Sequence, residues 1–351
     1  MRGAKVETQN LFSYISPEER VPQDHPLRTI RAIVDRALVE LDPHFDLIYS
    51  DLGRPSIPPE HLQRALLLEV FYSIRSERQL MEQLNYNLLF RWFAGLDMDA
   101  PIWVPTVFTK NRDRLLDNGT IRCFFRSVVD QARARDLLSD EHFSVDGTLL
   151  EAWASQKSFQ PKDPADRDGD GTDFRGQEQS NDIHVSATDP DARLYKKSAG
   201  DASRLAYLGH VLMDNRHSLI AEEQATTADG TAEVDAAVQM INDLGGTRRI
   251  TVGADKGDDR AGFVDGLRER NVSPLVARKR KGSAIDGRTT RHVGYDMSIH
   301  VRRRIESIFG WMKTVGGMRK TRFRGLERVG LHFSIAATTY NILRIPRLDA
   351  A

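Results

Sequence analysis

The sequence predicts a mixed α/β protein that begins with an all-helical region. Three observations support this: helical spacing of apolar residues in the first third, short apolar runs from about His142 onward, and an alternation of helices and strands after that. We place the boundary at residue 138, which gives a helical domain over 1–138 and an α/β domain over 139–351. No internal repeat is visible.

The helical region is predicted from apolar spacing and from helix-start signals. Pro58-Pro59 opens one helix, and Ser76 with Gln79 three residues later forms a capping box at the start of another. A module of this size can bind nucleic acid or a partner subunit. The expected helices cover 27–41, 59–74, 76–96, 106–116 and 120–137.

The second region is predicted from short apolar runs and amphipathic segments. Residues 156–180 are polar and rich in Asp and Gly, which indicates a long acidic surface loop. A loop rich in Lys and Arg is expected over 279–291. The expected strands cover 143–150, 183–188, 193–197, 206–213, 219–226, 249–255 and 272–277, and the expected helices 233–244, 260–270, 298–315 and 331–343.

Charge is balanced overall but not locally. Lys plus Arg is 50 and Asp plus Glu is 50, so the net charge of zero excludes a globally basic nucleic-acid binder. Residues 140–191 hold 13 acids and 4 bases, whereas residues 278–328 hold 15 bases and 4 acids. The basic block can hold a polyanion and the acidic block can hold cations. The alternative is two solvated faces of opposite sign.

Cysteine content and hydropathy limit the class further. The single cysteine, Cys123, excludes a disulfide framework and a cysteine zinc cluster. No apolar run reaches the ~18 residues of a membrane helix, and the first residues are polar. We therefore expect a cytoplasmic protein with no membrane association.

Three acidic residues occupy unusual positions. Asp146 interrupts an apolar strand, Asp255 ends another, and Glu306 lies in a basic helix. Three converging carboxylates repel one another and need a cation to stay ionised. Carboxylate oxygens suit Mg²⁺ or Mn²⁺, and two such ions ~4 Å apart can activate water and stabilise the leaving oxygen of a phosphodiester. By contrast, we expect Asp258 and Asp259 to form a helix N-cap or a solvated turn.

The helix around Glu306 favours contact with phosphates. Arg302 lies four residues before Glu306 and Lys313 seven after, so all three share one helical face. Glu306 is the only acid between residues 296 and 327, and a salt-bridged surface helix would need more acids. The alternative is a solvated arginine-rich helix. Its remaining cations are Arg303 and Arg304.

With these motifs the sequence resembles the bacterial insertion-sequence DDE transposases, in particular the insertion-sequence-five family. Arg302, Glu306 and Lys313 match its signature Tyr-x2-Arg-x3-Glu-x6-Lys, although Ile299 stands at the Tyr position. Tyr295 lies nearby without the right spacing. The runs Phe143-Ser-Val-Asp-Gly-Thr and Ile250-Thr-Val-Gly-Ala-Asp-Lys-Gly look like its two aspartate motifs, and residues 54–114 are similar to its N-terminal domain.

The resemblance implies a ribonuclease-H-like catalytic domain over 139–351. It implies cleavage at the ends of a mobile element and joining of the freed 3′-hydroxyl to target DNA, with two Mg²⁺ or Mn²⁺ ions. Asp146 would bind both ions, while Asp255 and Glu306 would each bind one. Arg302 and Lys313, with Arg303 and Arg304, would contact DNA.

The implied partners are double-stranded DNA, as terminal inverted repeats and target, and a second copy of the chain in a homodimer on DNA. The implied location is the bacterial cytoplasm, at the nucleoid. Two alternatives remain open: a metal-dependent nuclease on the same fold without strand joining, and a DNA-binding relic without catalysis, which the departure at Ile299 allows.

Overall fold

The computed structural model describes residues 16–49, 52, 56–117, 119–163, 179–196, 200–246 and 248–350. Most of the acidic loop expected over 156–180 therefore lies outside the described residues. Its first residues form a short 3-10 helix, η1 (Gln156–Ser158), and an unexpected strand, β2 (Phe159–Pro161). This strand pairs with β3 (His184–Ser186) in a separate two-stranded sheet.

The N-terminal region is entirely helical, as the apolar spacing predicts. The prediction of a single helix over 76–96 is wrong in one respect, because the helix is interrupted at Asn87. The Asn87 side chain accepts hydrogen bonds from the backbone N–H groups of Leu89 and Phe90, so it ends one helix and caps the next. The helices are α1 (Pro17–Arg20), α2 (Pro26–Ile48), α3 (Pro59–Phe71), α4 (Glu77–Tyr86), α5 (Leu88–Ala94), α6 (Pro105–Asp117) and α7 (Thr120–Arg133).

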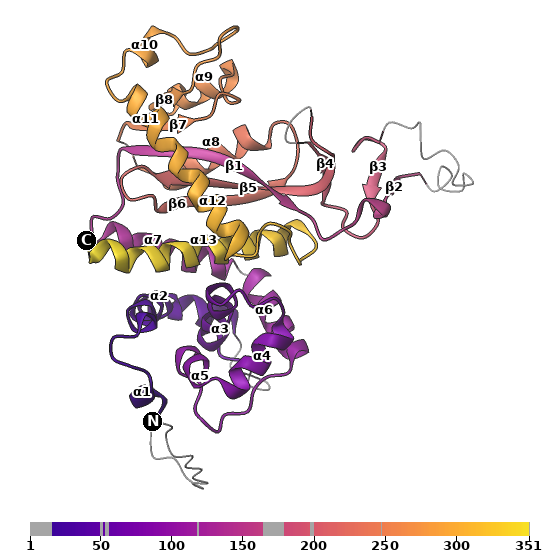
Figure 1. Cartoon of the computed structure of the whole chain (residues 1–351), viewed down its shortest axis with the longest axis vertical. Helices are drawn as coiled ribbons and strands as arrows, with labels where there is room; N and C mark the ends of the chain where they lie inside the picture. Colours follow the sequence, from indigo (N-terminus) through magenta and orange to yellow (C-terminus); the bar gives the residue numbers. More distant parts are fainter. Residues whose placement is uncertain are drawn as a thin grey trace, which may run out of the picture.

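The rest of the chain forms a six-stranded mixed sheet with helices on both faces (Figure 1). Its strands are β1 (His142–Glu151), β4 (Arg193–Tyr195), β5 (Arg204–Asp214), β6 (Ile220–Thr227), β7 (Ile250–Ala254) and β8 (Val272–Val276). Its helices are α8 (Ala232–Leu244), α9 (Ala261–Glu269), α10 (Gly287–Thr290), α11 (Tyr295–Val301), η3 (Arg302–Arg304), α12 (Ile305–Thr314) and α13 (Leu326–Asp349).

The strand order is that of a ribonuclease-H-like core. β1, β5 and β6 are consecutive antiparallel neighbours, and β7 and β8 extend the sheet on the other side of β1 in parallel. The resulting order is β6-β5-β1-β7-β8, with the short β4 also paired to β5. This confirms the predicted fold class, an α/β ribonuclease-H-like domain preceded by helices.

Two helix expectations near the C-terminus need correction. The helix expected over 298–315 is divided into α11 and α12 by the 3-10 turn η3, which is formed by the three arginines. The helix expected over 331–343 extends over Leu326–Asp349. The added turns carry exposed charged residues such as Glu327, Arg328 and Arg347, which give no apolar signal. Within the expected segment, the amide group of Asn341 is buried and bonds both the N–H and the carbonyl of Ile220 in β6.

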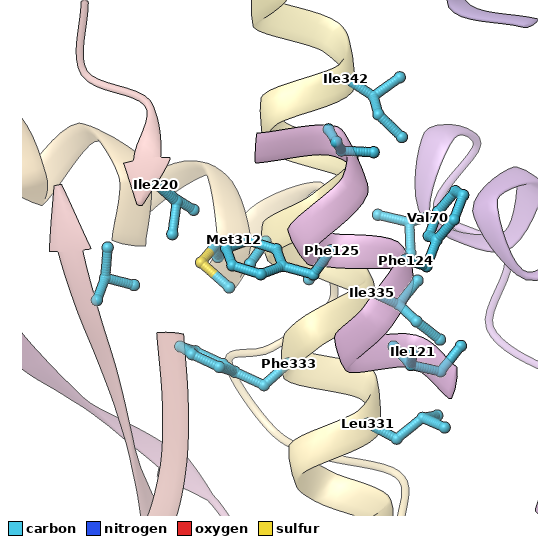
Figure 2. Close-up of a cluster of buried hydrophobic side chains, with 14 of the residues drawn as sticks. Val70, Ile121, Phe124, Phe125, Ile220, Met312, Leu331, Phe333, Ile335 and Ile342 are labelled. Atoms are coloured by element: carbon cyan, nitrogen blue, oxygen red, sulfur yellow. The ribbon is translucent and has the colours of Figure 1, made fainter. Parts of the chain in front are cut away.

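Helix α13 packs between the sheet and the N-terminal helices. It contacts β5 and β6 on one side and α7, α2, α3 and α6 on the other. Figure 2 shows Phe333 pointing to the sheet, while Leu331 and Ile335 point toward α7 and its residues Ile121 and Phe124. One continuous hydrophobic cluster therefore includes residues of both the N-terminal helices and the sheet region. The division at residue 138 remains a prediction, and both sides of it share this core.

Replacing Gly209 with alanine is expected to destabilise this core by about 1–3 kcal/mol. Gly209 lies in β5, and a Cβ added there would come within 2.7 Å of the Phe333 ring atom Cζ. The ring is fully buried, so it cannot move aside without disturbing α13. Urea unfolding of the wild type and the variant measures the loss.

Gly262→Ala is the matched control for this substitution. Gly262 lies in α9, and an added Cβ there meets nothing within 4 Å. Because alanine favours a helix over glycine by roughly 0.5–1 kcal/mol, the control is expected to be neutral or stabilising. Equal stability of the two variants would contradict the close packing of Phe333 on β5.

In the described part of the chain, no helix combines the length and the apolar character that crossing a lipid bilayer requires.

Candidate active site

Two of the predicted acids lie at equivalent positions of neighbouring strands. In the parallel pairing of β1 with β7, Ser144 is opposite Gly253. Asp146 and Asp255 each follow two residues later, so the register places both at the carboxyl ends of this pairing. Their carboxylates are close enough for the charge of Asp255 to act on the ionisation of Asp146. The structure thus brings together two of the three predicted acids.

The surroundings of Asp146 disfavour its ionised form. Partial burial raises the pKa of Asp146 to about 6, and the negative charges of Asp255 and Glu233 raise it as well. Two groups oppose this: the Gly147 N–H donates to Asp146 Oδ1 at 2.8 Å, and Arg302 Nη1 lies 3.5 Å from Asp146 Oδ2. Asp146 therefore lies in a site where an added cation would stabilise the carboxylate.

Two further acids belong to this electrostatic cluster, and the sequence analysis missed both as site residues. Burial and the charges of Asp255, Glu233 and Asp146 together raise the pKa of Asp258 to about 7. The turn after β7 carries Asp258, and the first turn of α8 carries Glu233. In the sequence, Asp258 is marked only by its proximity to Asp255, which by itself indicates a helix cap or a solvated turn.

Helix α12, which directly follows the three arginines of η3, crosses the face of β1 (Figure 1). Ile305 and Ile308 bury the inner side of α12, and Glu306 is exposed in its first turn. Arg302 lies one turn earlier, where it reaches Asp146. Lys313 lies in the last turn and is partly buried. The other two predicted DNA contacts, Arg303 and Arg304, are exposed in η3.

The donor set suits a hard divalent cation. Asp146, Asp255, Asp258 and Glu233 supply only carboxylate oxygens, which Mg²⁺ and Mn²⁺ prefer. Within the residues described, however, no three acidic, histidine or cysteine side chains are grouped closely enough to hold one ion. The assignment of Glu306 as the third ligand therefore stays a prediction.

Tyr295 does not replace the tyrosine absent at Ile299. Its side chain is buried, its hydroxyl donates to the Val276 carbonyl at 3.1 Å, and the same oxygen accepts from the Arg278 N–H at 3.2 Å. The hydroxyl of Tyr295 is thus used inside the protein, between β8 and the following loop.

Family comparisons define the class of this protein. Residues 161–342, more than half of the chain, match the family described as "Transposase DDE domain", and residues 15–114 match "Transposase domain (DUF772)". The chain belongs to the transposase DDE domain family, and it is an enzyme that acts as a DNA transposase. Asp255 and Glu306 lie within the larger match, whereas Asp146 precedes it.

Searches of solved structures return other transposases at low similarity. A piggyBac transposase synaptic complex with hairpin DNA is 10% identical, with a TM-score of 0.42, covering 91% of this chain and 74% of that one. The Mos1 strand transfer complex is 14% identical, with a TM-score of 0.25, covering 86% and 81%. No curated protein matches the chain.

Proposed function

We propose that this transposase cuts DNA at the ends of an insertion sequence and joins the freed 3′-hydroxyl to target DNA. Asp146, Asp255 and Glu306 are the proposed ligands of two Mg²⁺ or Mn²⁺ ions. The single observation that carries this proposal is the placement of Asp146 and Asp255 at equivalent positions of adjacent parallel strands, with Arg302 beside them. We further propose membership of the insertion-sequence-five group, on Arg302, Glu306 and Lys313.

The chain's own residues have separable tasks in this reaction. Bound ions would activate the attacking hydroxyl and stabilise the leaving oxygen. Arg302 holds the first carboxylate in place, and its partly exposed side chain can also approach a phosphate oxygen. Arg303, Arg304 and Lys313 would hold the DNA backbone along α12.

The remaining parts of the proposal concern assembly. We propose that the helical region, residues 1–138, binds the terminal inverted repeats and that two copies of the chain pair two DNA ends. The match of residues 15–114 to a second transposase domain supports a role for this region in transposition. Helix α4 keeps one exposed face, which includes Arg78, Glu82 and Tyr86 and is available for DNA.

Strand-joining assays test the reaction. Duplexes that end in the element's inverted repeat are incubated with Mg²⁺ or Mn²⁺, and duplexes with a pre-cut 3′-hydroxyl are given a target plasmid. Transposition predicts cleavage in the first case and joined product in the second. Hydrolysis without joining would favour the nuclease, and duplex binding without cleavage would favour the catalytically inactive relic.

Lys313→Ala is expected to weaken duplex binding and to lower the slope of log K against log salt by about one phosphate contact. The physical reason is the loss of one cation from the last turn of α12. Fluorescence anisotropy over a salt series measures the slope. Lys157→Ala, at an exposed lysine of η1 and outside α12, is the matched control. A slope equal to that of the control would place Lys313 outside the DNA path.

A further inference from the structure

The segment Arg278–Ala284, named here the basic loop, follows β8 directly. Its first four residues, Arg278 to Lys281, are all cationic, and it contains no acid. Arg278, Arg280 and Lys281 are exposed. Three neighbouring exposed cations without a balancing acid fit a polyanion better than a network of surface salt bridges.

The basic loop lies at the edge of the sheet that carries the candidate active site. β7 and β8 are parallel neighbours in which Ala254 is opposite Val276, and the Ala277 N–H donates to the Ala254 carbonyl at 3.2 Å. Asp255 follows on one strand, and Arg278 begins the loop just beyond the corresponding point of the other. The loop and the carboxylates therefore emerge side by side from the carboxyl ends of adjacent strands.

A buried carboxylate fixes the backbone of this loop. Asp259 is only 1% exposed, and it accepts hydrogen bonds from the Lys279 N–H at 2.7 Å and from the Ala284 N–H at 2.8 Å. The Lys279 ammonium group also donates to the Asp259 carbonyl at 2.8 Å. Between these two anchor points, Gly282 has a φ of 66°, which lets the chain reverse direction.

The start of the loop has a second anchor, which is the Tyr295 hydroxyl described above. It joins the Arg278 N–H to the Val276 carbonyl, so the last residue of β8 and the first cation are held together. Hydrogen bonds to the Asp259 carboxylate outweigh the effect of its burial and lower its pKa, which keeps the anchor ionised. Such a loop loses little conformational entropy when it binds a ligand.

We propose that the basic loop grips the backbone of the duplex DNA that carries the scissile phosphate, with Asp259 and Tyr295 as positioning residues that hold the loop beside Asp146 and Asp255. This inference rests on the proposed function, which places duplex DNA at these carboxylates. Arg280 and Lys281 supply the phosphate contacts. Lys279 is turned inward and serves the loop itself.

The first test removes the contacts. Arg280→Ala/Lys281→Ala is expected to weaken binding of a fluorescent duplex and to lower the slope of log K against log salt by about two contacts, measured without divalent metal. The control is Arg216→Ala/Arg248→Ala. These two exposed arginines lie at the opposite edge of the sheet, after β5 and before β7. A slope change no larger than that of the control would overturn the proposal.

The second test removes the anchor and leaves every cation in place. Asp259→Ala takes away a negative charge, so electrostatics alone predicts tighter DNA binding. The proposal predicts binding weaker by about fivefold or more, because the cations are no longer held in place. Tyr295→Phe, which loses only the hydroxyl bonds, is expected to weaken binding in the same direction and serves if Asp259→Ala fails to fold. Tighter or unchanged binding in folded variants would refute the positioning role.

These experiments separate the inference from the proposed function. If the wild type binds duplex DNA and cleaves it while the loop variants behave like their control, the inference is wrong and the proposed function stands. If the wild type neither binds nor cleaves duplex ends, the proposed function itself fails. Reduced binding in the loop variants, together with normal binding in Asp146→Asn, would support both.

Discussion

Asp146→Asn is expected to reduce DNA cleavage by at least about 100-fold while leaving duplex affinity nearly unchanged. The substitution preserves shape and removes one negative charge from the group of carboxylates that lies in the middle of β1 and just after β7. A neutral amide is a poor ligand for Mg²⁺, whereas phosphate contacts come from cations elsewhere. Cleavage of a labelled end duplex and anisotropy on the same DNA give the two values.

Asp140→Asn is the matched control for this experiment. Asp140 is an exposed acid just before β1, whereas Asp146 lies in the middle of that strand. Cleavage by the control is expected to remain close to that of the wild type. Normal cleavage by Asp146→Asn would show that the first metal ligand has been assigned to the wrong residue.

Arg322→Ala is expected to lower the free energy of unfolding by about 3–5 kcal/mol. Arg322 follows α12 and reaches into the N-terminal helices, where it bonds the Ile74 carbonyl and the Glu69 carboxylate, each at 3.0 Å. Glu69 is 5% exposed, and burial raises its pKa to about 7. Without Arg322 the Glu69 carboxylate would lose its hydrogen-bonded cation and keep only the charge of Arg112 nearby, which is costly for a buried group. Urea unfolding at pH 8 measures the loss.

Arg328→Ala is the comparison. Its partner Asp113 also belongs to the N-terminal helices, but the side chain of Arg328 is 50% exposed, so less than about 1 kcal/mol is expected. The loss in Arg322→Ala should also shrink as the pH falls from 8 toward 5. A carboxyl group with a raised pKa takes up a proton in the folded state, which removes the unpaired charge. Equal losses in both variants, independent of pH, would contradict this account.

The fold and half of the candidate site could be predicted from local patterns. Asp146 and Asp255 are visible in the sequence because each stands in or directly after an apolar strand, and parallel strands bring such residues to one edge. The basic segment that forms η3 and α12 can be recognised in the sequence because its cations far outnumber its acids. These features need only the spacing of neighbouring residues.

The features that sequence reasoning missed depend on contacts between distant segments. The sequence indicates only a turn at Asp259. Its partners Lys279 and Ala284 lie at least about 20 residues later, in a loop whose path the sequence does not predict. Glu233 enters the site only through the packing of α8 against the sheet. The break at Asn87 was hidden for a different reason: both flanking helices have good helical residues, and only the cap shows where one ends.

The packing of α13 has a consequence for how the enzyme is made. Both the sheet and the helical region bury apolar faces against this helix, which follows all their other described elements in the sequence. Neither region can complete its interior until this helix has been synthesised. A nonsense or frameshift mutation shortly before residue 326 would therefore be expected to inactivate DNA binding and catalysis together, and would not release a competent fragment of either kind.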